Sequence, residues 1–380
     1  MSSTPRYDTY SNMKCSFTNL IVFLLLVVLH CGTRCCTSLS LTNNNLVVRI
    51  GTRSSELAQT QARHFQELLQ RKHINIKTEI LPIDASGDKT GVANKTSTQQ
   101  LPLAIQGVDF TGALDVALAD GIVDVVVHSL KDIPPANRWR INTDAPQVTI
   151  GAYLGPRENP LDVIVMSKQY NSIQSLPTGA KVGSASIRRQ AQLLAYRPDL
   201  NIINIRGNID ARLKALDREE LDGLILAFAG LKRLGLLFDN DTIYQCKPIP
   251  ADVMLPGVGQ GIIAVTCRTN DARTMSLLKE VDNHDNRIAA TTERSFLDSV
   301  DYLSPWSGRP PVAGLMIRRE EFWQFRGLLA TPDGSKVLTV HETLQNSHCN
   351  EAAGLKLGRE AANDLLKQAG DDFLDGYYNL

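Results

Sequence analysis

The sequence predicts an α/β fold, because apolar segments typical of strands alternate with segments of helical periodicity along most of the chain. In the first such unit, Leu46–Ile50 is apolar except for Arg49, a polar turn follows, and Glu56–Arg71 carries apolar residues at helical spacing. Ser55 is the expected N-cap of that helix. The chain has 380 residues, 43% hydrophobic and 21% charged, which suits a globular protein of two or three domains.

The alternation continues toward the C-terminus. Further strands are expected within 74–83 and at 122–127, 180–183, 201–205, 221–227, 262–265, 312–317 and 322–329. Further helices are expected at 112–119, within 184–197, and at 208–216, 289–300 and 351–368. The polar segment 84–100 is rich in Gly, Thr, Ser, Lys and Asn, and its length indicates a functional loop.

The first 45 residues are expected to form a targeting leader. Leu20–Leu29 is an unbroken apolar run, with Arg6 and Lys14 before it and small residues after it. This pattern is typical of a secretory signal peptide, whereas a permanent membrane anchor needs about 20 apolar residues. A buried core helix is the weaker alternative, because the run has no amphipathic period. Thr37–Asn45, which follows, is rich in Ser, Thr and Asn and free of acidic residues. The family resemblance given below implies onward delivery to a plastid through the secretory pathway, with retention in that pathway as the alternative.

Charge and cysteine content argue against several classes of protein. The chain has 40 basic and 40 acidic residues, without the basic excess that is typical of nonspecific nucleic-acid binders. Four of its seven cysteines lie in the leader, and Cys246, Cys267 and Cys349 are too far apart in sequence to be paired metal ligands. We therefore expect neither a metal site nor a disulfide framework.

Cationic side chains follow several of the predicted strands. They are Arg53, Lys131, Arg188, Arg189, Arg206 and Arg212. Open α/β sheets bind ligands at their strand ends, where helix N-termini add backbone N–H donors, and guanidinium groups hold carboxylates through two parallel hydrogen bonds. The placement predicts a cleft for a ligand with several carboxylates. Ordinary solvated surface arginines are the alternative.

Asp132 is the lone carboxylate among these cations. Beside Lys131 and the arginines we expect it to stay ionised. An ionised aspartate in a cleft can stabilise a positive charge that develops on a substrate. A structural salt bridge with Lys131, or a cap of the turn before Ile133, would explain the residue equally well.

Six segments of the chain form a further pattern: Ile50–Arg53, His128–Pro134, Gly183–Gln190, Arg206–Ile209 with Arg212, Ala229–Gly235 and Leu255–Gly261. In residues, order and spacing they resemble the signature blocks of the porphobilinogen deaminase (hydroxymethylbilane synthase) family. The resemblance covers roughly Leu46 to the C-terminus. It implies two hinged α/β domains like those of periplasmic binding proteins, followed by a smaller α+β domain. The expected boundaries are 46–150 with 250–270, 151–249, and 275–380.

The resemblance also implies a function in tetrapyrrole biosynthesis, which supplies heme and chlorophyll. Family members condense four porphobilinogen units head to tail, release one ammonia each time, and prime the chain on a dipyrromethane cofactor that is bound to a cysteine through a thioether. Asp132 and Lys131 would be catalytic. Carboxylates of the cofactor would be held by Ser129, Lys131, Ser186, Arg188 and Arg189. Carboxylates of the substrate or growing chain would be held by Arg53, Ser55, Arg206, Arg212, Arg233 and Gln260.

The cofactor loop departs from the family pattern. Glu293–Phe296 and Pro311–Ala313 match its two sides, but Gly308 occupies the cysteine position and the loop is a few residues longer. No cysteine occurs between Cys267 and Cys349, and a serine is too weak a nucleophile to form the thioether. Covalent attachment of dipyrromethane is therefore not expected.

A second departure lies at Ile105–Ala113, which lacks the two lysines of the matching family segment. The sequence thus favours a divergent hydroxymethylbilane synthase that holds its primer without a covalent bond. A paralogue that binds porphyrin precursors without turnover is the alternative, and a solute-binding protein is a weaker third. The expected partner is porphobilinogen or a related polycarboxylated pyrrole. We expect no nucleic acid, no stable membrane span in the mature form, no metal, and a monomer.

Overall fold

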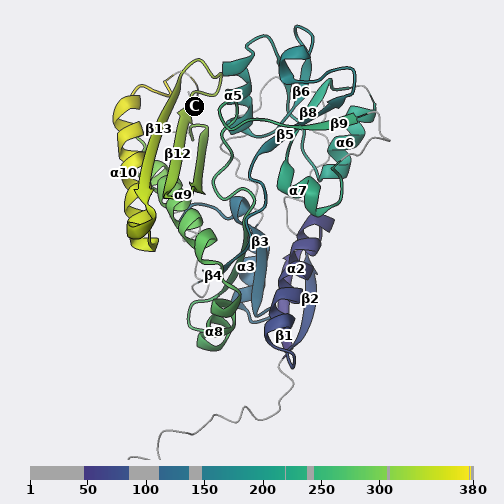
Figure 1. Cartoon of the computed structure of the whole chain (residues 1–380). Helices are drawn as coiled ribbons and strands as arrows, with labels where there is room; N and C mark the ends of the chain where they lie inside the picture. The colour runs from purple at the N-terminus through teal and green to yellow at the C-terminus, as the bar shows by residue number, and fades with distance from the viewer. Residues whose placement is uncertain are drawn as a thin grey trace, which may run out of the picture. The chain divides into compact units, whose positions relative to one another are not determined.

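The computed structural model describes residues 47–84, 111–136, 148–218, 220–237, 244–305, 309–375 and 377, which belong to one compact unit. The expected leader, residues 85–100 of the polar loop, residues 105–110 and Gly308 lie outside the described residues. The described residues form three sheets with helices packed against them (Figure 1).

The first sheet has five strands in the order β2-β1-β3-β10-β4. Its strands are β1 (Val47–Arg53), β2 (Lys77–Ile83), β3 (Val125–Ser129), β4 (Val148–Leu154) and β10 (Ile263–Arg268). The helices α2 (Glu56–Lys72), α3 (Gly112–Ala119) and α8 (Ala272–Val281) pack against it. β1 runs parallel to β2 and β3, and β10 is antiparallel to β3 and β4. Ile50 and Phe65, both fully buried, lie in the core between this sheet and α2.

The second sheet also has five strands, in the order β7-β6-β8-β5-β9. Its strands are β5 (Asp162–Ser167), β6 (Lys181–Gly183), β7 (Asn201–Ile203), β8 (Gly223–Ala227) and β9 (Tyr244–Pro248). The helices between or after them are η3 (Ile173–Ser175), α5 (Ile187–Tyr196), α6 (Ile209–Asp217) and α7 (Phe228–Arg233). β6 is parallel to β7 and β8, whereas β5 is antiparallel to β8 and β9.

The chain crosses between these two sheets twice, from β4 to β5 and back from β9 to β10. The two crossing segments touch, because the N–H of Glu158 donates to the carbonyl of Gly261 at 3.2 Å. Gly261 has a φ of 91°, and a Cβ there would collide with the Glu158 carbonyl. Only glycine permits this backbone conformation together with this close approach. Residues of both sheets are thereby brought side by side.

The third sheet is antiparallel, in the order β11-β12-β13. Its elements are β11 (Val312–Arg318), β12 (Phe322–Ala330), β13 (Val337–Gln345), α9 (His284–Leu303), η4 (Asn346–His348) and α10 (Glu351–Ala369). α9 and α10 pack against each other beside this sheet (Figure 1). Phe296 of α9 meets Phe325 of β12 edge to face, with 5.2 Å between the ring centroids, inside a shared apolar core.

A buried carboxylate on α9 connects this third part to the crossing segments. Glu293 is fully buried and accepts hydrogen bonds from Arg157 at 2.6 and 3.1 Å. It also accepts the N–H of Gly259 at 2.7 Å and that of Met316 in β11 at 2.7 Å. One side chain therefore holds both crossings and β11 together.

The predicted fold class is confirmed: two α/β parts joined by two crossings, and a smaller C-terminal α+β part. Four strands (β4, β5, β9, β13) and two helices (α7, α8) were not anticipated. β4 continues the first sheet past the expected boundary at residue 151, and α8 packs against β4 although the third domain was expected from residue 275.

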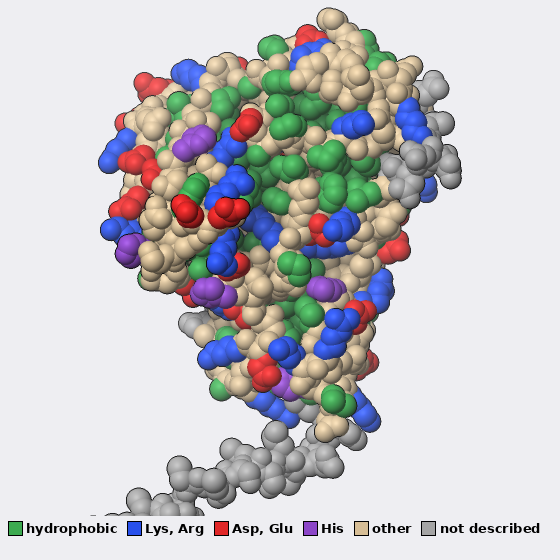
Figure 2. Space-filling model, in the orientation of Figure 1, with side chains coloured by type: hydrophobic (Ala, Val, Ile, Leu, Met, Phe, Trp, Pro, Cys, Tyr) green, Lys and Arg blue, Asp and Glu red, His purple; other side chains and the backbone are tan. Residues whose placement is uncertain are grey.

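The described surface and helices also bear on the expected partners. Figure 2 shows Lys and Arg side chains interspersed with Asp and Glu on the visible face, in keeping with the zero formal net charge. Within the described ranges, no helix is both long and apolar enough to cross a membrane. In the same residues, no group of His, Cys, Asp and Glu side chains is arranged to hold a metal ion.

Candidate active site

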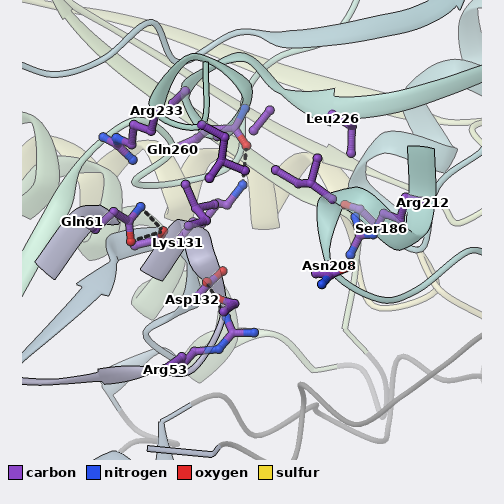
Figure 3. A pocket seen from close by; sticks show the side chains of 18 of the residues that line it. Arg53, Gln61, Lys131, Asp132, Ser186, Asn208, Arg212, Leu226, Arg233 and Gln260 are labelled. Atoms are coloured by element: carbon purple, nitrogen blue, oxygen red, sulfur yellow. Dashed lines mark hydrogen bonds and ion pairs between the residues drawn. The ribbon is translucent and has the colours of Figure 1, made fainter. Parts of the chain in front are cut away.

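A cavity of about 380 Å³ is lined by residues from the first two sheets and the crossing segments. This size lies within the range of roughly 300–1,000 Å³ that is common for small-molecule sites. The predicted site residues that line it are Arg53, Ser55, Ser129, Lys131, Asp132, Ser186, Arg189, Arg206, Arg212, Arg233 and Gln260. Arg188 is absent from the lining. Residues that are 207 positions apart in sequence thus share one hollow (Figure 3).

The first sheet contributes Asp132 and the cation that faces it. β1 ends at Arg53, and the short 3-10 helix η2 (Leu130–Asp132) follows β3 directly. Nη1 of Arg53 lies 3.4 Å from Oδ2 of Asp132, and both side chains are partly open to solvent (Figure 3). Nearby, Gln61 of α2 and Ser129 exchange hydrogen bonds of 2.8 and 3.2 Å. Asp132 is thus held at the cavity wall by Arg53.

The loop before β10 fixes the position of η2. The N–H of Leu130 donates to the carbonyl of Ile262 at 3.0 Å. Gly259 has a φ of 74°, and a Cβ there would lie 2.7 Å from Cγ of Leu130. This close packing requires glycine, and it locates Lys131 and Asp132 relative to Gln260.

Lys131 extends into the cavity and has a perturbed pKa. Its Nζ donates to Oε1 of Gln260 at 3.1 Å. The residue is exposed at the cavity wall, but the surrounding protein removes part of the hydration of its ammonium group. This desolvation and the repulsion from Arg189 lower the pKa of Lys131 to about 8, against the opposing attraction of Asp132 and Asp162. Lys131 therefore remains mainly charged at neutral pH.

Asp162, at the start of β5, is a fully buried carboxylate that the sequence analysis missed. Nη1 of Arg188 lies 2.8 Å from its Oδ2, and Arg189 donates to its Oδ1 from Nε at 3.1 Å and from Nη2 at 2.8 Å. Burial favours the protonated acid, but the two guanidinium groups prevail and hold the pKa of Asp162 well below its usual range.

Arg188 and Arg189 consequently differ in role. Arg188 is buried, and besides its ion pair with Asp162 it donates to the carbonyl of Leu255 at 2.8 Å. Arg189 pairs with the same carboxylate but also lines the cavity. The only local signal for Asp162 was a polar residue at the head of an apolar run, since its cationic partners come 26 and 27 residues later.

Three arginines from the second sheet bring positive charge without a carboxylate partner among the described residues. Nε of Arg206 is buried with no hydrogen-bond partner there. Arg212 donates to the carbonyl of Gly207 at 2.8 Å, and Arg233 donates to that of Gly261 at 2.7 Å. Burial lowers the pKa of Arg212 and of Arg233 to about 10, so both stay charged at neutral pH. Such cations bind an anionic ligand without first breaking an ion pair.

Three helix N-termini also line the cavity. Ser186 is the N-cap of α5 and makes no side-chain capping bond, while Asn208 caps α6 by accepting the N–H of Ala211 at 2.9 Å. Ser55, the N-cap of α2, likewise makes no capping bond. The two serine hydroxyls of α2 and α5 and the positive ends of these helices add to the attraction for carboxylates.

The described cysteines lie away from this cavity. Cys267 is fully buried in β10 within the core of the first sheet. Cys246 packs against the core of the second sheet, and Cys349 packs against the core around α9 and α10. The described part of the cavity lining therefore offers cations, hydroxyl groups and the carboxylates of Asp132, Glu56 and Asp210, but no thiol.

The chain matches a protein-family model described as "Porphobilinogen deaminase, dipyromethane cofactor binding domain" over residues 48–276. It is 36% identical over 327 residues to the porphobilinogen deaminase of Syntrophomonas wolfei, covering 85% of this chain and 96% of that protein. It is 35% identical to the enzyme of the same name from Listeria monocytogenes, covering 87% and 98%. It is 36% identical to a chloroplastic porphobilinogen deaminase from Oryza sativa, covering 87% and 86%.

Solved structures with a partly similar fold include a periplasmic VFT2 domain of BvgS from Bordetella pertussis, with a TM-score of 0.37 and 14% identity. That match covers 62% of this chain and 86% of the domain. Another is a probable amino-acid ABC transporter extracellular-binding protein from Bacillus subtilis, with a TM-score of 0.38 and 10% identity over 63% of this chain and 90% of that one.

Proposed function

Because the chain belongs to the porphobilinogen deaminase family, we propose that it acts as a hydroxymethylbilane synthase of tetrapyrrole biosynthesis. It would join four porphobilinogen units and release one ammonia for each unit. The observation that carries this proposal is the cavity in which Asp132 lies among cations contributed by two sheets.

The cavity residues suit the binding step. Porphobilinogen carries two carboxylates, and Arg206 and Arg212 offer guanidinium groups that no carboxylate of the described residues neutralises. Charge-assisted hydrogen bonds between such groups are among the strong polar contacts in proteins. Ser55 and Arg233 would extend the same anion-binding surface on either side. We therefore assign substrate orientation chiefly to Arg206 and Arg212.

Asp132 suits the chemical step. When the protonated aminomethyl group leaves as ammonia, the C–N bond breaks, its electron pair departs with nitrogen, and a positive charge spreads over the remaining methylene-pyrrole. Asp132, held by Arg53 and partly shielded from water, would stabilise that charge at the point where it develops. Attack on this methylene by the free pyrrole position at the end of the growing chain, followed by loss of the proton from that position, then restores neutrality.

A dipyrromethane group fits the polar lining of the cavity. Ser129, Ser186, Lys131 and Arg189 would hold its carboxylates; Arg188 would act through Asp162, because it lies outside the lining. When bound, the group supplies the free pyrrole position to which the first substrate unit is joined. The thioether does not fit, because no cysteine occurs between Cys267 and Cys349. We therefore propose that the primer is held without a covalent bond.

Mass spectrometry tests this proposal directly. After incubation with porphobilinogen, we expect ammonia release and hydroxymethylbilane, detected as the uroporphyrin that forms from it. We also expect an adduct that is visible under native conditions and lost on denaturation. An adduct that survives denaturation would contradict noncovalent priming. The absence of both ammonia and product would contradict the enzymatic function itself.

The proposed destination is a plastid, reached through the secretory pathway. The apolar run Leu20–Leu29 and the chloroplastic relative from rice support it. A fluorescent protein fused to residues 1–45 should accumulate in plastids of a cell with secretory plastid import. Fluorescence confined to the endoplasmic reticulum would instead indicate retention in the secretory pathway.

We further propose a monomer with domains at 46–150 with 250–270, 151–249 and 275–380, and without affinity for nucleic acid. The balance of 40 basic and 40 acidic residues supports the last point. Sedimentation equilibrium should give the mass of one chain, with or without added DNA. Limited proteolysis should separate these three segments before it cuts inside them.

A further inference from the structure

We infer that Gln260 is a positioning residue, which bridges Lys131 of the first sheet to Asp162 of the second and so holds the cations of both sheets in one arrangement. Its expected role was contact with the substrate. Its position and hydrogen bonds favour a different one.

The amide of Gln260 is engaged on both sides. Oε1 accepts Nζ of Lys131 at 3.1 Å, while Nε2 donates to Oδ1 of Asp162 at 2.9 Å and to the carbonyl of Pro160 at 2.7 Å. The residue is 1% exposed, so little of it is left to meet a ligand. Because donor and acceptor ends have separate partners, the amide is fixed in one orientation.

The backbone of Gln260 is fixed as well. Its carbonyl accepts Nε of Arg157 at 3.0 Å, and the neighbouring Gly259 donates to the buried Glu293 at 2.7 Å. Glu293 in turn binds the guanidinium of Arg157. The bridge is therefore attached to a rigid crossing segment.

The amide of Gln260 links charged side chains that otherwise attract or repel one another across the cavity. Lys131 faces Arg189 and Arg188 from α5, Asp162 from β5 and Asp132 from η2. Asp162 balances the two arginines, and the Gln260 Oε1 dipole favours the ammonium form of Lys131. Without the amide, Lys131 would lose its acceptor and the partly desolvated charge would be less favourable.

Replacing Gln260 tests this inference in two ways. In Gln260→Met, the pH at the midpoint of the Lys131 titration should fall by about 0.5 to 1 pH unit, because one hydrogen bond to the charged form is lost. The titration is measured by trace labelling of amines with acetic anhydride from pH 6.5 to 10, with the exposed Lys356 as internal reference. Gln260→Asn keeps an amide but is one methylene too short to span both partners, and it serves if Gln260→Met does not fold.

The matched control is Gln192→Met. Gln192 is 4% exposed, and its amide makes hydrogen bonds to the backbone of Arg188 and Leu255. The variant therefore loses a comparably buried amide that does not bind Lys131 or Asp162. Its variant should leave the Lys131 midpoint unchanged. An equal midpoint in wild type and both Gln260 variants would overturn the inference.

A second measurement rests on the proposed function. With porphobilinogen, KM of the Gln260 variants should rise about tenfold, because displaced cations bind carboxylates less well, while kcat changes less. A fall in kcat alone would overturn the positioning role. If the wild-type chain releases no ammonia, the proposed function fails, yet the Lys131 titration still decides the inference about Gln260.

Discussion

At the scale of single residues, the cavity contains more cations than the carboxylates of its walls can neutralise. Asp162 balances Arg188 and Arg189, and Asp132 faces Arg53, but Arg206, Arg212 and Arg233 have no carboxylate partner among the described residues. Such an arrangement costs stability in the free protein, because each cation loses hydration without gaining a counter-ion. A polycarboxylate ligand would recover that cost on binding.

Substitution of one unpaired arginine should therefore separate binding from folding. Arg206→Gln should raise KM for porphobilinogen roughly 10-fold to 100-fold, as expected when a charge-assisted hydrogen bond is lost. The melting temperature should stay the same or rise, because an unmatched charge is removed. Steady-state ammonia release and thermal unfolding measure the two effects. Arg218→Gln, at the exposed end of α6, is the control and should change neither. An Arg206→Gln variant that melts earlier but keeps its KM would show a structural arginine.

Asp132 should matter for rate more than for binding. Asp132→Asn keeps the size of the side chain but removes the negative charge, so the initial rate of ammonia release should fall about 100-fold or more. Binding of porphobilinogen, followed by calorimetry, should persist because the carboxylate-binding arginines remain. Asp120→Asn, on the exposed C-cap of α3, should retain the full rate. A full rate in Asp132→Asn would rule out the proposed electrostatic role.

At the scale of secondary-structure elements, α9 supports the site through Glu293, which binds both crossing segments, although the described residues of α9 lie outside the cavity lining. Glu293→Gln should lower the free energy of unfolding by about 3–5 kcal/mol, because it leaves the guanidinium of Arg157 without its buried counter-ion. Urea denaturation measures the change. Asp285→Asn breaks the exposed pair with Arg318 and should cost less than about 1 kcal/mol. Equal losses in both variants would contradict a special role for Glu293.

Elements with a strong local pattern were predictable, and those that depend on distant partners were not. The helix expected at Glu56–Arg71 is α2, one residue longer, because its apolar spacing defines it locally. Ser55 occupies the expected N-cap position, although its side chain makes no capping bond. β5 was missed, since Val163–Met166 is a short apolar run whose place depends on antiparallel pairing with β8 and β9. Helix α7 was missed because it is only six residues long.

In the candidate site, too, the positions set by local sequence were predictable and the contacts between distant segments were not. The strand-end positions of Arg53, Lys131 and Arg206 followed from the alternation of strands and helices, and the structure places them around one cavity. The inward turn of Arg188 toward Asp162 could not be predicted, because the two residues belong to elements that meet only in the folded sheet. The bridging amide of Gln260 was hidden for the same reason, since its partners lie about 100 and 130 residues earlier.

At the scale of the whole molecule, the cavity couples ligand binding to pH through Lys131. The pKa of this residue is lowered to about 8 in the folded chain, whereas the ordinary pKa of a lysine side chain is 10.5. Between these two values the unfolded chain binds more protons, so this group makes the free protein gain stability as pH rises from about 8 to 10.5. A bound carboxylate has the opposite effect. It favours the charged amine, so affinity should be greatest below pH 8 and decrease as pH rises beyond it.

The increase in melting temperature caused by porphobilinogen should accordingly be larger at pH 7 than at pH 9.5, because stabilisation by a ligand follows its affinity. Differential scanning fluorimetry at both pH values, with and without the ligand, measures this difference. The Lys131→Met variant should bind porphobilinogen more weakly at pH 7. Its increase in melting temperature should also lose the pH dependence that Lys131 contributes. Any pH dependence that this variant retains comes from titration of the ligand. The wild-type protein and Lys131→Met are compared by how their ligand-induced increase in melting temperature changes with pH. If the two changes are the same, Lys131 does not hold a ligand carboxylate.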